Sequence, residues 1–579
     1  MPPSLPEADV DVDWRDGMFA DPHVKARFLP NGEIRLTSGL NLSHCSRTTL
    51  DWLARWAVES PDAVFVSEAM GQHGDRRTLN YGQAWRDSGR IGAGLLANGL
   101  RPGDRLMVIA PNSIAHMRIA LAALRSGIVY VPIAPQYAAP GADAAKLAGV
   151  LDMVAPAAIY RDEVETAPTV GDGFVLIEGP AALDTLTKSA DALAAPSIEG
   201  LNPDLPAKLL LTSGSTGTPK AVPYSHRLMT VNLQATVDVW PFIGRRKPVL
   251  VDWLPWNHAF GGSNNVHLVL SQGGTLHIDQ SGGRPEALDR HVANLRELRP
   301  TFHGAVPAGW AALLPAIERD HSFREAFFGG LDAMFSAGAA MSADLFDRLI
   351  RASASVRGFP VPILTGWGAT ETGPGATIVH DVRARPGWIG TPIPGTEIRL
   401  VPQEGKHELR VRGLGVMPGY WGRPDLTANV FDDEGFYRTG DAGCLVDPTC
   451  PELGLVFDGR LADDFKLANG SWVNVTRLRL ELLRRADGAL RDVVIVGADR
   501  PHVAALCWVN DHDMLDELFV AHNRDHRAQT MRIDRFATLT PPPSAEMGEL
   551  TAKGEINRRA LLARRQDAVA ALYERNGQS

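Results

Sequence analysis

The sequence predicts a mixed α/β protein with a large N-terminal body and a small C-terminal lobe. Strand, helix and strand patterns follow one another between residues 104 and 135, which is typical of parallel sheets covered by helices. After about Ile389 the pattern changes to short alternating strands separated by glycine turns. From Arg460 onward we expect a further helix, more strands and a late helix. The 579 residues are enough for several hydrophobic cores.

The N-terminal body begins with helices and strands in alternation. Residues 52–99 predict a helix, a short hairpin and a second helix, whose apolar residues recur at near-helical spacing. The run DRLMVIAPNS (104–113) predicts a buried strand. The next run, IAHMRIALAALRSGIVYVPIAP (114–135), predicts a helix that stops at Gly127 and then another strand. This body should therefore consist of stacked α/β sheet subdomains.

The end of the body has a different pattern. Residues of about 390–459 alternate apolar and polar side chains between glycines, as in KHELRVRG, and predict a β-rich subdomain that forms an antiparallel sheet or small barrel. We expect residues 1–459 to form the N-terminal domain. Residues 460–579 should form a small, mobile α+β domain, with the seam near residues 459–464.

Composition excludes some classes of function. The net charge of −9 argues against a nucleic-acid partner, because phosphate backbones require a basic face. Residues 1–13 lack the basic-then-apolar pattern of a signal peptide. The most apolar region, residues 119–134, is interrupted by Arg125 and Pro132 and cannot span a bilayer. We therefore predict no membrane partner. The four cysteines are expected to be reduced and mostly buried, which fits a cytoplasmic protein.

The segment LLTSGSTGTPKAV (210–222) is a candidate phosphate-binding loop. It follows a leucine-rich strand, and the residues after it can form a helix. Gly214 and Gly217 allow a sharp turn that points successive N–H groups at an anion, and serine and threonine hydroxyls add donors. Lys220 adds a positive charge, so the loop suits the β- and γ-phosphates of ATP. By composition alone, a flexible loop is the more common outcome.

The order of residues in this loop resembles the phosphate loop of the adenylate-forming ligases, which include acyl-CoA synthetases, peptide-synthetase adenylation domains and luciferases. Further segments resemble that family in the expected order, over roughly residues 50–565. They are SAGAAM (336–341) against adenine, GWGATETG (366–373) with the metal-binding acid, YRTGD (437–441) for ribose and GRLADDFKLANG (459–470) as the hinge. The resemblance implies the fold of that family, with ATP, Mg²⁺ and coenzyme A as cofactors.

Three charged residues acquire roles from this resemblance. Glu371 lies in a glycine-rich turn, where a carboxylate could hold Mg²⁺ against phosphate oxygens. Asp441 offers two acceptor oxygens to the two hydroxyls of a ribose. Arg460 is expected to contact phosphate or ribose. Without the family context, each would read as an ordinary surface residue of a turn or hinge.

His258, in DWLPWNHAFGGSNN, lies between an apolar strand and two glycines. A single histidine in such a place is more often a hydrogen-bonded core residue. By resemblance it flanks the acyl carboxylate and helps to control the path of the thiol, and Phe260 lines the acyl pocket. Trp256 and Trp367 could add to a flat apolar slot for an aromatic ring, although core packing is the alternative for each.

Lys553, in GELTAKGEINRRAL, is the expected catalytic lysine. Its ammonium would stabilise the charge that develops where a carboxylate oxygen attacks the α-phosphate. The family usually has glycine before this lysine, whereas here Gly554 follows it, an order that resembles the feruloyl-CoA synthetase branch. Ala462 stands where the hinge often has an acidic residue, which leaves the pivot position open.

The predicted site is thus composed of three groups of residues. The catalytic residues are Lys553, His258 and Glu371, and Glu371 is also the metal ligand. The nucleotide-binding residues are Thr212, Ser213, Gly214, Ser215, Thr216, Gly217, Lys220, Gly338, Ala339, Ala340, Trp367, Gly368, Thr370, Asp441 and Arg460. The substrate-binding residues are His258, Phe260, Ala305, Val306 and Gly366.

The resemblance implies an enzyme that joins a carboxylic acid to AMP and then to a thiol. The short stretch after Lys553 leaves no room for a carrier or reductase domain, so free coenzyme A is the expected acceptor. The feruloyl-CoA synthetase branch implies a 4-hydroxycinnamate such as ferulate. A ligase for another aryl or medium-chain acid, and a nucleotide-binding protein without turnover, stay open as alternatives, as does a homodimer.

Overall fold

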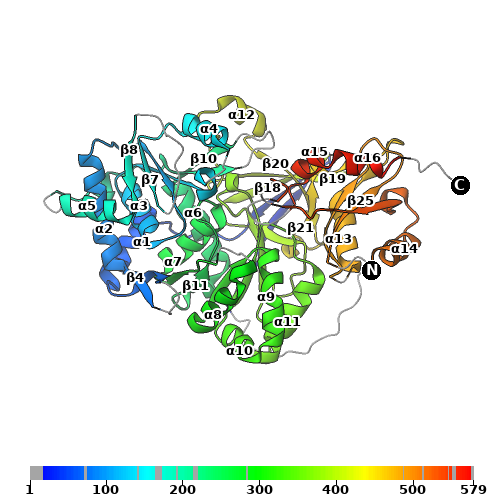
Figure 1. Ribbon diagram of the computed structural model, residues 1–579, viewed down its shortest axis with the longest axis horizontal. Helices are drawn as coiled ribbons and strands as arrows, with labels where there is room; N and C mark the ends of the chain where they lie inside the picture. Colours follow the sequence, from blue (N-terminus) through cyan, green and yellow to red (C-terminus); the bar gives the residue numbers. More distant parts are fainter. Residues whose placement is uncertain are drawn as a thin grey trace.

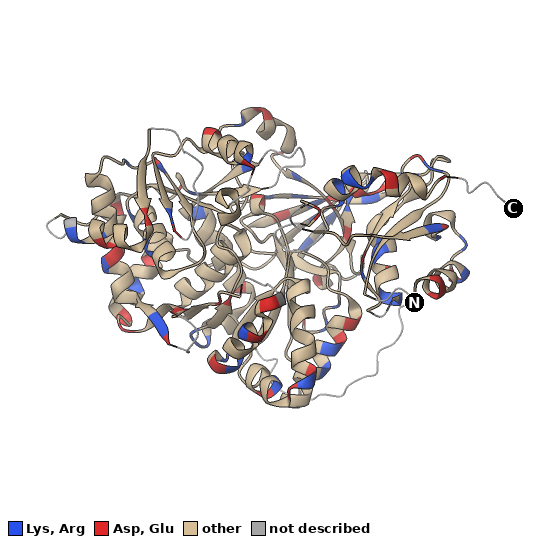
Figure 2. Cartoon of the chain, in the orientation of Figure 1, with Lys and Arg blue, Asp and Glu red and all other residues tan. Residues whose placement is uncertain are grey.

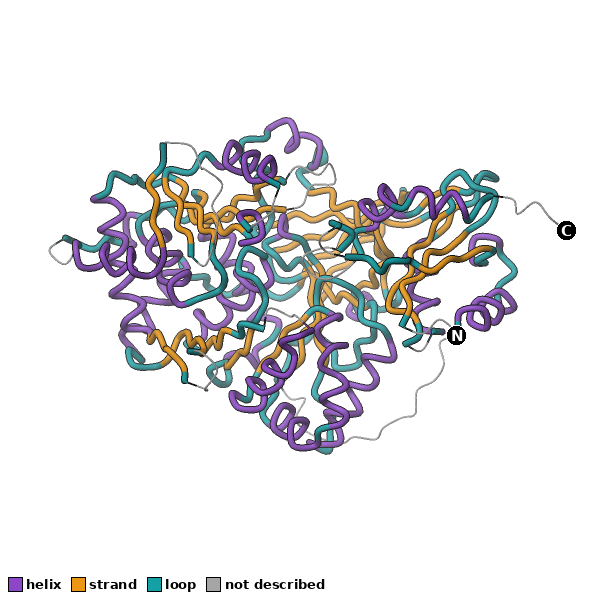
Figure 3. The backbone as a smooth tube through the Cα atoms, viewed as in Figure 1, coloured by secondary structure: helices purple, strands orange, loops and turns teal. Residues whose placement is uncertain are grey.

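The computed structural model shows the mixed α/β fold that the sequence predicts (Figure 1). Strands run through the middle of the molecule and helices lie on the outside (Figure 3). The structure describes residues 17–70, 75–139, 143–162, 173–190, 193–212, 219–281, 285–403, 405–486, 488–510, 514–544, 547–550 and 556–574.

The first sheet has six strands in the order β10-β9-β6-β5-β7-β8. Its strands are β5 (Arg105–Ile109), β6 (Val129–Ile133), β7 (Ala158–Arg161), β8 (Val175–Glu178), β9 (Pro206–Thr212) and β10 (Lys220–Ser225). All neighbours are parallel except β9 and β10, which form an antiparallel pair.

Strand β5 is continuously apolar because both of its faces are buried. Leu106 and Val108 belong to one hydrophobic cluster, together with residues of α2 (Tyr81–Ala97) and α3 (Ile114–Arg125). Met107 and Ile109 belong to another cluster, with residues of α4 (Ala144–Val154). A strand that is buried on both faces has no need for polar alternation. Gly127, the predicted helix stop, follows α3 with a φ of +68°.

The second sheet has four strands in the order β11-β12-β3-β4. They are β3 (Val64–Ala69), β4 (Arg76–Asn80), β11 (Val249–Asp252) and β12 (Thr275–Ile278). Helices α1 (Thr49–Glu59), α6 (His226–Val239) and α7 (Val266–Gln272) contribute to the same hydrophobic cluster as α2 and α3, as does this sheet. The helix, hairpin and helix predicted for residues 52–99 are confirmed as α1, β3–β4 and α2.

The third sheet has eleven strands in the order β1-β2-β18-β19-β20-β21-β17-β16-β15-β14-β13. Its strands are β1 (Val24–Phe28), β2 (Ile34–Ser38), β13 (Phe302–Ala305), β14 (Ala333–Ser336), β15 (Ile363–Trp367), β16 (Thr377–Ile378), β17 (Trp388–Pro392), β18 (Thr396–Gln403), β19 (Lys406–Gly413), β20 (Tyr437–Leu445) and β21 (Leu455–Arg460). Helices α8 (Leu288–Leu298), α9 (Pro307–Arg319), α10 (His321–Gly329) and α11 (Ala343–Arg357) pack beside β13–β15, and α12 (Pro424–Val430) precedes β20.

This third sheet combines the end of the α/β part with the predicted β-rich subdomain. Strands β13, β14 and β15 are parallel, whereas β15 to β21 pair antiparallel. The predicted β-rich subdomain is therefore hydrogen-bonded to the α/β part as one sheet. Two N-terminal strands complete its edge: β2 pairs with β18, and β1 pairs with β2.

The C-terminal part has two small sheets, β22–β23 and β24-β25-β26. Its elements are β22 (Phe465–Lys466), β23 (Trp472–Val473), α13 (Val475–Arg485), β24 (Leu490–Val496), β25 (Ala504–Val509), α14 (Leu515–Asp525), β26 (Arg535–Thr538), α15 (Arg558–Arg564) and α16 (Gln566–Ala571). Its two hydrophobic clusters draw their buried members from Phe465 onward. Lys406 of β19 pairs with Asp464, and Asn474 donates to Asp458 at 2.8 Å, so these contacts bridge the predicted seam. The domain limits themselves stay a prediction.

The surface carries basic and acidic residues interspersed along the outer helices (Figure 2). All four cysteines are free thiols, but only Cys507 is buried, so the expectation of mostly buried cysteines was wrong. Cys444 is exposed because it faces outward from β20. In the part of the chain that the structure describes, no helix is both long and apolar enough to cross a bilayer.

Gly390 of β17 provides a test of how the two halves of the third sheet fit together. Its φ is +78°, and an added Cβ would lie 1.9 Å from the carbonyl oxygen of Ile378 on β16. Gly435 also has a φ of +78°, but a Cβ there would meet no described atom within 4 Å. Gly435→Ala should therefore cost about 1–2 kcal/mol of backbone strain. Gly390→Ala should lower the free energy of unfolding by more than about 3 kcal/mol. Urea unfolding of both variants measures this, and equal losses would contradict the close packing of β16 on β17.

Candidate active site

The predicted phosphate loop lies between the two strands of the β9–β10 hairpin. Thr212 and Lys220 are paired opposite each other at its base. The predicted loop residues between them lie outside the described residues, as does Lys553. These residues are Ser213, Gly214, Ser215, Thr216 and Gly217. The structure therefore fixes where the loop starts and ends.

Tyr420 connects the base of this loop to the predicted metal-binding acid. The Lys220 Nζ lies 4.8 Å from the centre of the Tyr420 ring. The Tyr420 hydroxyl donates a hydrogen bond of 2.9 Å to Glu371 Oε1. Two residues that are far apart in the sequence, Lys220 and Glu371, thus both contact one phenol. The sequence analysis did not single out Tyr420.

Backbone hydrogen bonds hold this arrangement in place. The N–H of Trp421 donates to the carbonyl of Ala221 on β10 at 2.9 Å, and the N–H of Met417 donates to the carbonyl of Glu371 at 2.9 Å. The Tyr224 hydroxyl donates to the carbonyl of Thr370 at 2.6 Å. The hairpin, the turn of Glu371 and residues 417–421 therefore form one connected unit.

Glu371 lies in a short 3₁₀ turn, Thr370–Thr372 (η7), that follows β15, and its side chain is buried. Its hydrogen-bond donor, Tyr420, is a neutral phenol: burial raises the pKa of Tyr420 above its usual value, and Glu371 adds to that rise. A carboxylate supplies oxygen ligands of the kind that Mg²⁺ prefers. This donor chemistry fits a divalent cation.

Asp441 lies on β20 opposite Arg460 of β21. The Trp367 indole N–H donates to Asp441 Oδ2 at 2.8 Å, and Arg460 Nε lies 3.5 Å from Oδ1. Burial raises the pKa of Asp441, while Arg460 and the Trp367 hydrogen bond act in the opposite direction. Each carboxylate oxygen can accept more than one hydrogen bond, so Asp441 retains acceptor capacity for a ligand.

The remaining nucleotide and substrate predictions cluster at the carboxyl ends of β13, β14 and β15. Ala305 pairs in register with Ser336, after which the turn of Gly338, Ala339 and Ala340 begins. Gly338 has a φ of +94°, which favours glycine. Gly366 and Trp367 end the adjacent strand β15. The carboxyl edge of parallel strands is where ligands bind in α/β sheets.

Two glycines of this edge are required by the fold itself. A Cβ on Gly368 would lie 2.0 Å from the carbonyl oxygen of Pro374, and one on Gly366 would lie 2.9 Å from that of Thr377. Both positions therefore need glycine for backbone packing. Their predicted contacts with nucleotide and substrate stay predictions.

His258 lies two residues before a π-helix, η5 (Phe260–Asn265), an element that is frequent at functional sites. Added Cβ atoms on Gly261 and Gly262 would lie 2.5 and 2.0 Å from backbone carbonyl oxygens of Leu254 and Trp256. The two glycines thus let this segment fold back closely on the chain before it. His258 is half-buried, and its carbonyl accepts from the N–H of Gly262 at 2.9 Å.

Phe260 lies beside the carboxyl end of β13. Its ring packs edge-on against Phe335 of β14 at 5.3 Å, and a Cβ on Gly304 would lie 3.2 Å from it. Gly304 therefore leaves room for this ring next to Ala305. Ala305 and Val306 are buried. Trp256 is also buried, with its ring 5.2 Å from His116.

Lys208 of β9 is a buried lysine whose amine contacts the π-helix. It is 2% exposed, and its Nζ donates to the carbonyl of Gly262 at 2.7 Å and to Ser263 Oγ at 3.1 Å. The same ammonium lies 5.6 Å from the centre of the Tyr130 ring. Burial lowers the pKa of Lys208 to about 7. The only sequence signal for it is a lone lysine inside an apolar strand, a pattern with many ordinary explanations.

Comparison with known proteins agrees with this geometry. The profile described as AMP-binding enzyme matches residues 53–421. The chain belongs to the AMP-binding enzyme family. Feruloyl-CoA synthases of an Amycolatopsis and a Streptomyces species are each 31% identical to it over 410 residues, which cover 68% of this chain and 75% of theirs. Crystalline ATP-bound MatB of Rhodopseudomonas palustris has the same fold, with a TM-score of 0.72 and 23% identity, covering 90% of this chain and 99% of that one.

The family match, residues 53–421, includes the structural unit around Tyr420. The match includes the β9–β10 hairpin, the carboxyl edge of β13–β15 and Tyr420, which lies next to its end. Asp441, Arg460 and Lys553 lie beyond it. Membership of the AMP-binding enzyme family is therefore supported by the part of the site that holds Lys220 and Glu371 together.

Lys208 gives a prediction for the pH dependence of stability. Its pKa is about 7 in the folded protein and 10.5 in the unfolded chain, so between these values the unfolded state binds a proton that the folded state has released. Stability should then rise with pH over this window, by roughly 1 kcal/mol per pH unit, relative to Lys208→Met. Below pH 7 both states are protonated and the difference should be flat. Unfolding midpoints of both proteins from pH 6 to about 10 measure this, and parallel curves would contradict the depressed pKa.

Proposed function

We propose that the protein is an ATP-dependent acid–thiol ligase that converts a carboxylic acid to its coenzyme A thioester through an acyl-AMP intermediate. The observation that carries the proposal is the connection from Lys220 through Tyr420 to Glu371. It holds a cation for phosphate oxygens and an anion for a metal ion side by side, at the mouth of a hairpin whose loop has the composition of a phosphate cradle. This is the charge pattern that a nucleoside triphosphate requires.

The nucleotide would lie along the carboxyl edge of the third sheet. The loop of residues 213–218 and Lys220 would hold the β- and γ-phosphates, and residues 338–340 would lie against adenine. Asp441 would accept hydrogen bonds from the ribose hydroxyls, with Arg460 beside it. Thr370 and Gly368 border the turn of Glu371 and complete this surface.

Mg²⁺ would be held by Glu371, whose carboxylate oxygen receives its hydrogen bond from a neutral phenol. When bound, the ion would supply positive charge to the phosphate oxygens of ATP. The protein would contribute by holding Glu371 in position. The turn Thr370–Thr372 fixes Glu371 through the backbone contacts of Thr370 with Tyr224 and of Glu371 with Met417.

In the first half-reaction, a carboxylate oxygen of the substrate forms a bond to the α-phosphorus of ATP. The bond from that phosphorus to the pyrophosphate oxygen breaks, and pyrophosphate leaves with both electrons. Lys553 would stabilise the negative charge on the α-phosphoryl oxygens, and His258 would flank the acyl carboxylate. Charge stabilisation at fixed positions is the main contribution that such a transfer needs.

In the second half-reaction, the thiolate of coenzyme A attacks the acyl carbonyl carbon and AMP leaves. The thiol proton passes to solvent or to a phosphate oxygen. The two steps need different neighbours around one acyl group, so we propose that residues 460–579 rotate about the segment near Ala462 between them. Small residues such as Ala462 can absorb the backbone change.

We propose a 4-hydroxycinnamate such as ferulate as the acid, with the reaction in the cytoplasm. The relatives called feruloyl-CoA synthases support this choice. The structure adds that Phe260 lies over Gly304 beside Ala305, so an aromatic face borders the carboxyl end of β13. Aromatic rings pack well on such faces. Another aryl acid or a medium-chain acid is the second candidate, because an apolar slot alone discriminates weakly. Assembly as a homodimer stays a prediction.

The purified protein, supplied with ATP, Mg²⁺ and coenzyme A, tests the function directly. Pyrophosphate release should depend on an added acid, and ferulate or p-coumarate should exceed octanoate by at least about tenfold in kcat/KM. Preference for octanoate would overturn the aromatic assignment alone. If no acid in a broad panel provokes cleavage between the α- and β-phosphates, the chain only binds nucleotide and the proposal fails.

The role of Lys553 predicts a separation of the two half-reactions. Lys553→Ala should slow acyl-AMP formation by about 10²–10³-fold, because it removes a positive charge from the transition state. Thioester formation from supplied acyl-AMP should change much less. Lys188→Ala, at the exposed end of α5 (Gly179–Ser189), is the matched control and should leave both steps unchanged. If Lys553→Ala also leaves both steps unchanged, another group has this role.

A further inference from the structure

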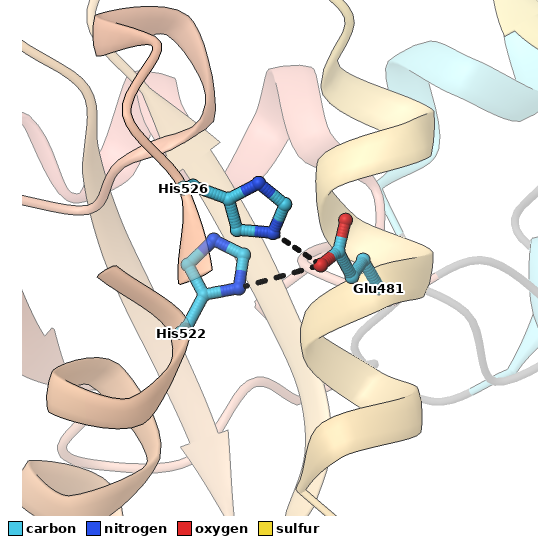
Figure 4. Close-up of side chains that lie close together, drawn as sticks. All are labelled: Glu481, His522 and His526. Carbon is cyan, nitrogen blue, oxygen red and sulfur yellow. Dashed lines mark hydrogen bonds and ion pairs between the residues drawn. The ribbon is translucent and has the colours of Figure 1, made fainter. Parts of the chain in front are cut away.

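A cluster of two histidines and one glutamate lies in the C-terminal part of the chain, among residues that the proposed ligase reaction does not use. Glu481 lies on α13, His522 on α14, and His526 directly follows α14 (Figure 4). Their ligand atoms all lie within 4.8 Å of one another. We propose that Glu481, His522 and His526 bind a divalent transition-metal ion of the zinc type.

The separations of the ligand atoms suit such an ion. His526 Nε2 lies 2.5 Å from Glu481 Oε1, and His522 Nδ1 lies 3.8 Å from the same oxygen. Tetrahedral zinc with bonds of about 2.1 Å separates neighbouring ligand atoms by about 3.4 Å. The observed separations lie on both sides of this value, so small side-chain rotations would allow all three atoms to reach one ion.

His522 provides a second and independent observation. Its side chain is 0% exposed, and its Nε2 lies 2.7 Å from the carbonyl oxygen of Met531. A carbonyl only accepts, so Nε2 carries the proton and Nδ1 has a lone pair. That buried Nδ1 has no hydrogen-bond partner and faces Glu481 (Figure 4). An unpaired buried acceptor is costly, and a metal bond would satisfy it. Metal-binding histidines are commonly oriented in this way by a carbonyl on the other ring nitrogen.

The surroundings leave the glutamate charge available. Arg485 Nε lies 3.3 Å from Glu481 Oε1, but the same guanidinium also donates to Asp525 at 2.8 Å. Asp525 thus offsets the charge of Arg485. Glu481 and His526 are 17% and 22% exposed, so an ion could enter from solvent and keep a water molecule as its fourth ligand. When the ion binds His526 Nε2, the ring proton occupies Nδ1 and any second proton leaves to solvent.

Two imidazole nitrogens and one carboxylate oxygen form a donor set that selects zinc-type ions over Mg²⁺. The ion would join α13 to α14, whose apolar residues Leu478, Leu482 and Phe519 already pack in one hydrophobic cluster. We therefore expect a structural metal site rather than a catalytic one. It would stabilise the folded C-terminal part, because a ligand that binds only the folded state shifts unfolding to higher temperature.

The test uses the full chain after treatment with a chelator and its removal. The protein is titrated with zinc chloride against a chromophoric chelator, and with cobalt chloride for the visible spectrum of a four-coordinate ion. His526→Gln and Glu481→Gln should each weaken binding at least about tenfold and remove the cobalt spectrum. The control is His321→Gln. His321 pairs with Glu325 at 3.6 Å on the solvent side of α10, where the two side chains are 70% and 60% exposed, and this variant should bind like the unmodified chain.

Thermal unfolding provides a readout that is independent of affinity. Zinc should raise the unfolding midpoint of the unmodified chain and of His321→Gln, but not of His526→Gln. Without metal, we expect equal unfolding midpoints for all three proteins, because His526 is partly exposed and its replacement should cost little stability. Equal midpoints would show that the variants are folded. If His526→Gln binds zinc as tightly as the unmodified chain, or if no protein binds it at micromolar concentration, the cluster is only an ion pair and the proposal is overturned.

Discussion

The hydrogen bond from Tyr420 to Glu371, with the backbone bonds on either side of it, is the interaction on which the candidate site depends. It connects three segments: the β9–β10 hairpin, the turn after β15 and residues 417–421. The first two segments belong to different sheets, so their relative position is set by this contact and by the packing between the sheets. A phosphate loop and a metal-binding acid are useful to ATP only at a fixed separation. Tyr420 contacts both Lys220 at the base of the predicted loop and Glu371, so it would help to hold the two at such a separation.

The sequence predicted those parts of the fold in which one local pattern has one physical cause. Strand β5 could be recognised because burial on both faces demands an unbroken apolar run. The pairing of β2 with β18 could not be predicted, because β2 is short, carries a charge and meets a partner more than 350 residues away. Nothing in the local sequence records such a contact. The single eleven-stranded sheet therefore emerged only from the structure.

The candidate site shows the same division. Glu371, Asp441 and Lys220 could be proposed from the sequence because their motifs have a recognisable order, and their roles stay predictions. Tyr420 and Lys208 were missed, since an aromatic residue after glycine and a lysine in a strand have many ordinary explanations. Conversely, Gly366 and Gly368 were assigned to ligand binding, whereas the backbone carbonyl oxygens near them already require glycine there. A motif can thus be maintained by the fold at one position and by the ligand at the next.

Lys208 illustrates how the fold and the proposed substrate slot depend on one another. The π-helix that begins at Phe260 has backbone carbonyl groups that a regular helix would satisfy differently, and Lys208 donates to one of them, at Gly262, from inside the core. An apolar residue could fill the same volume, but it could not donate to Gly262 and Ser263. Burying an amine is costly, and its pKa falls accordingly. The buried amine therefore supports the segment that begins at Phe260, whose ring lies over Gly304, so we expect Lys208 to influence the proposed substrate slot through Gly262 and Ser263.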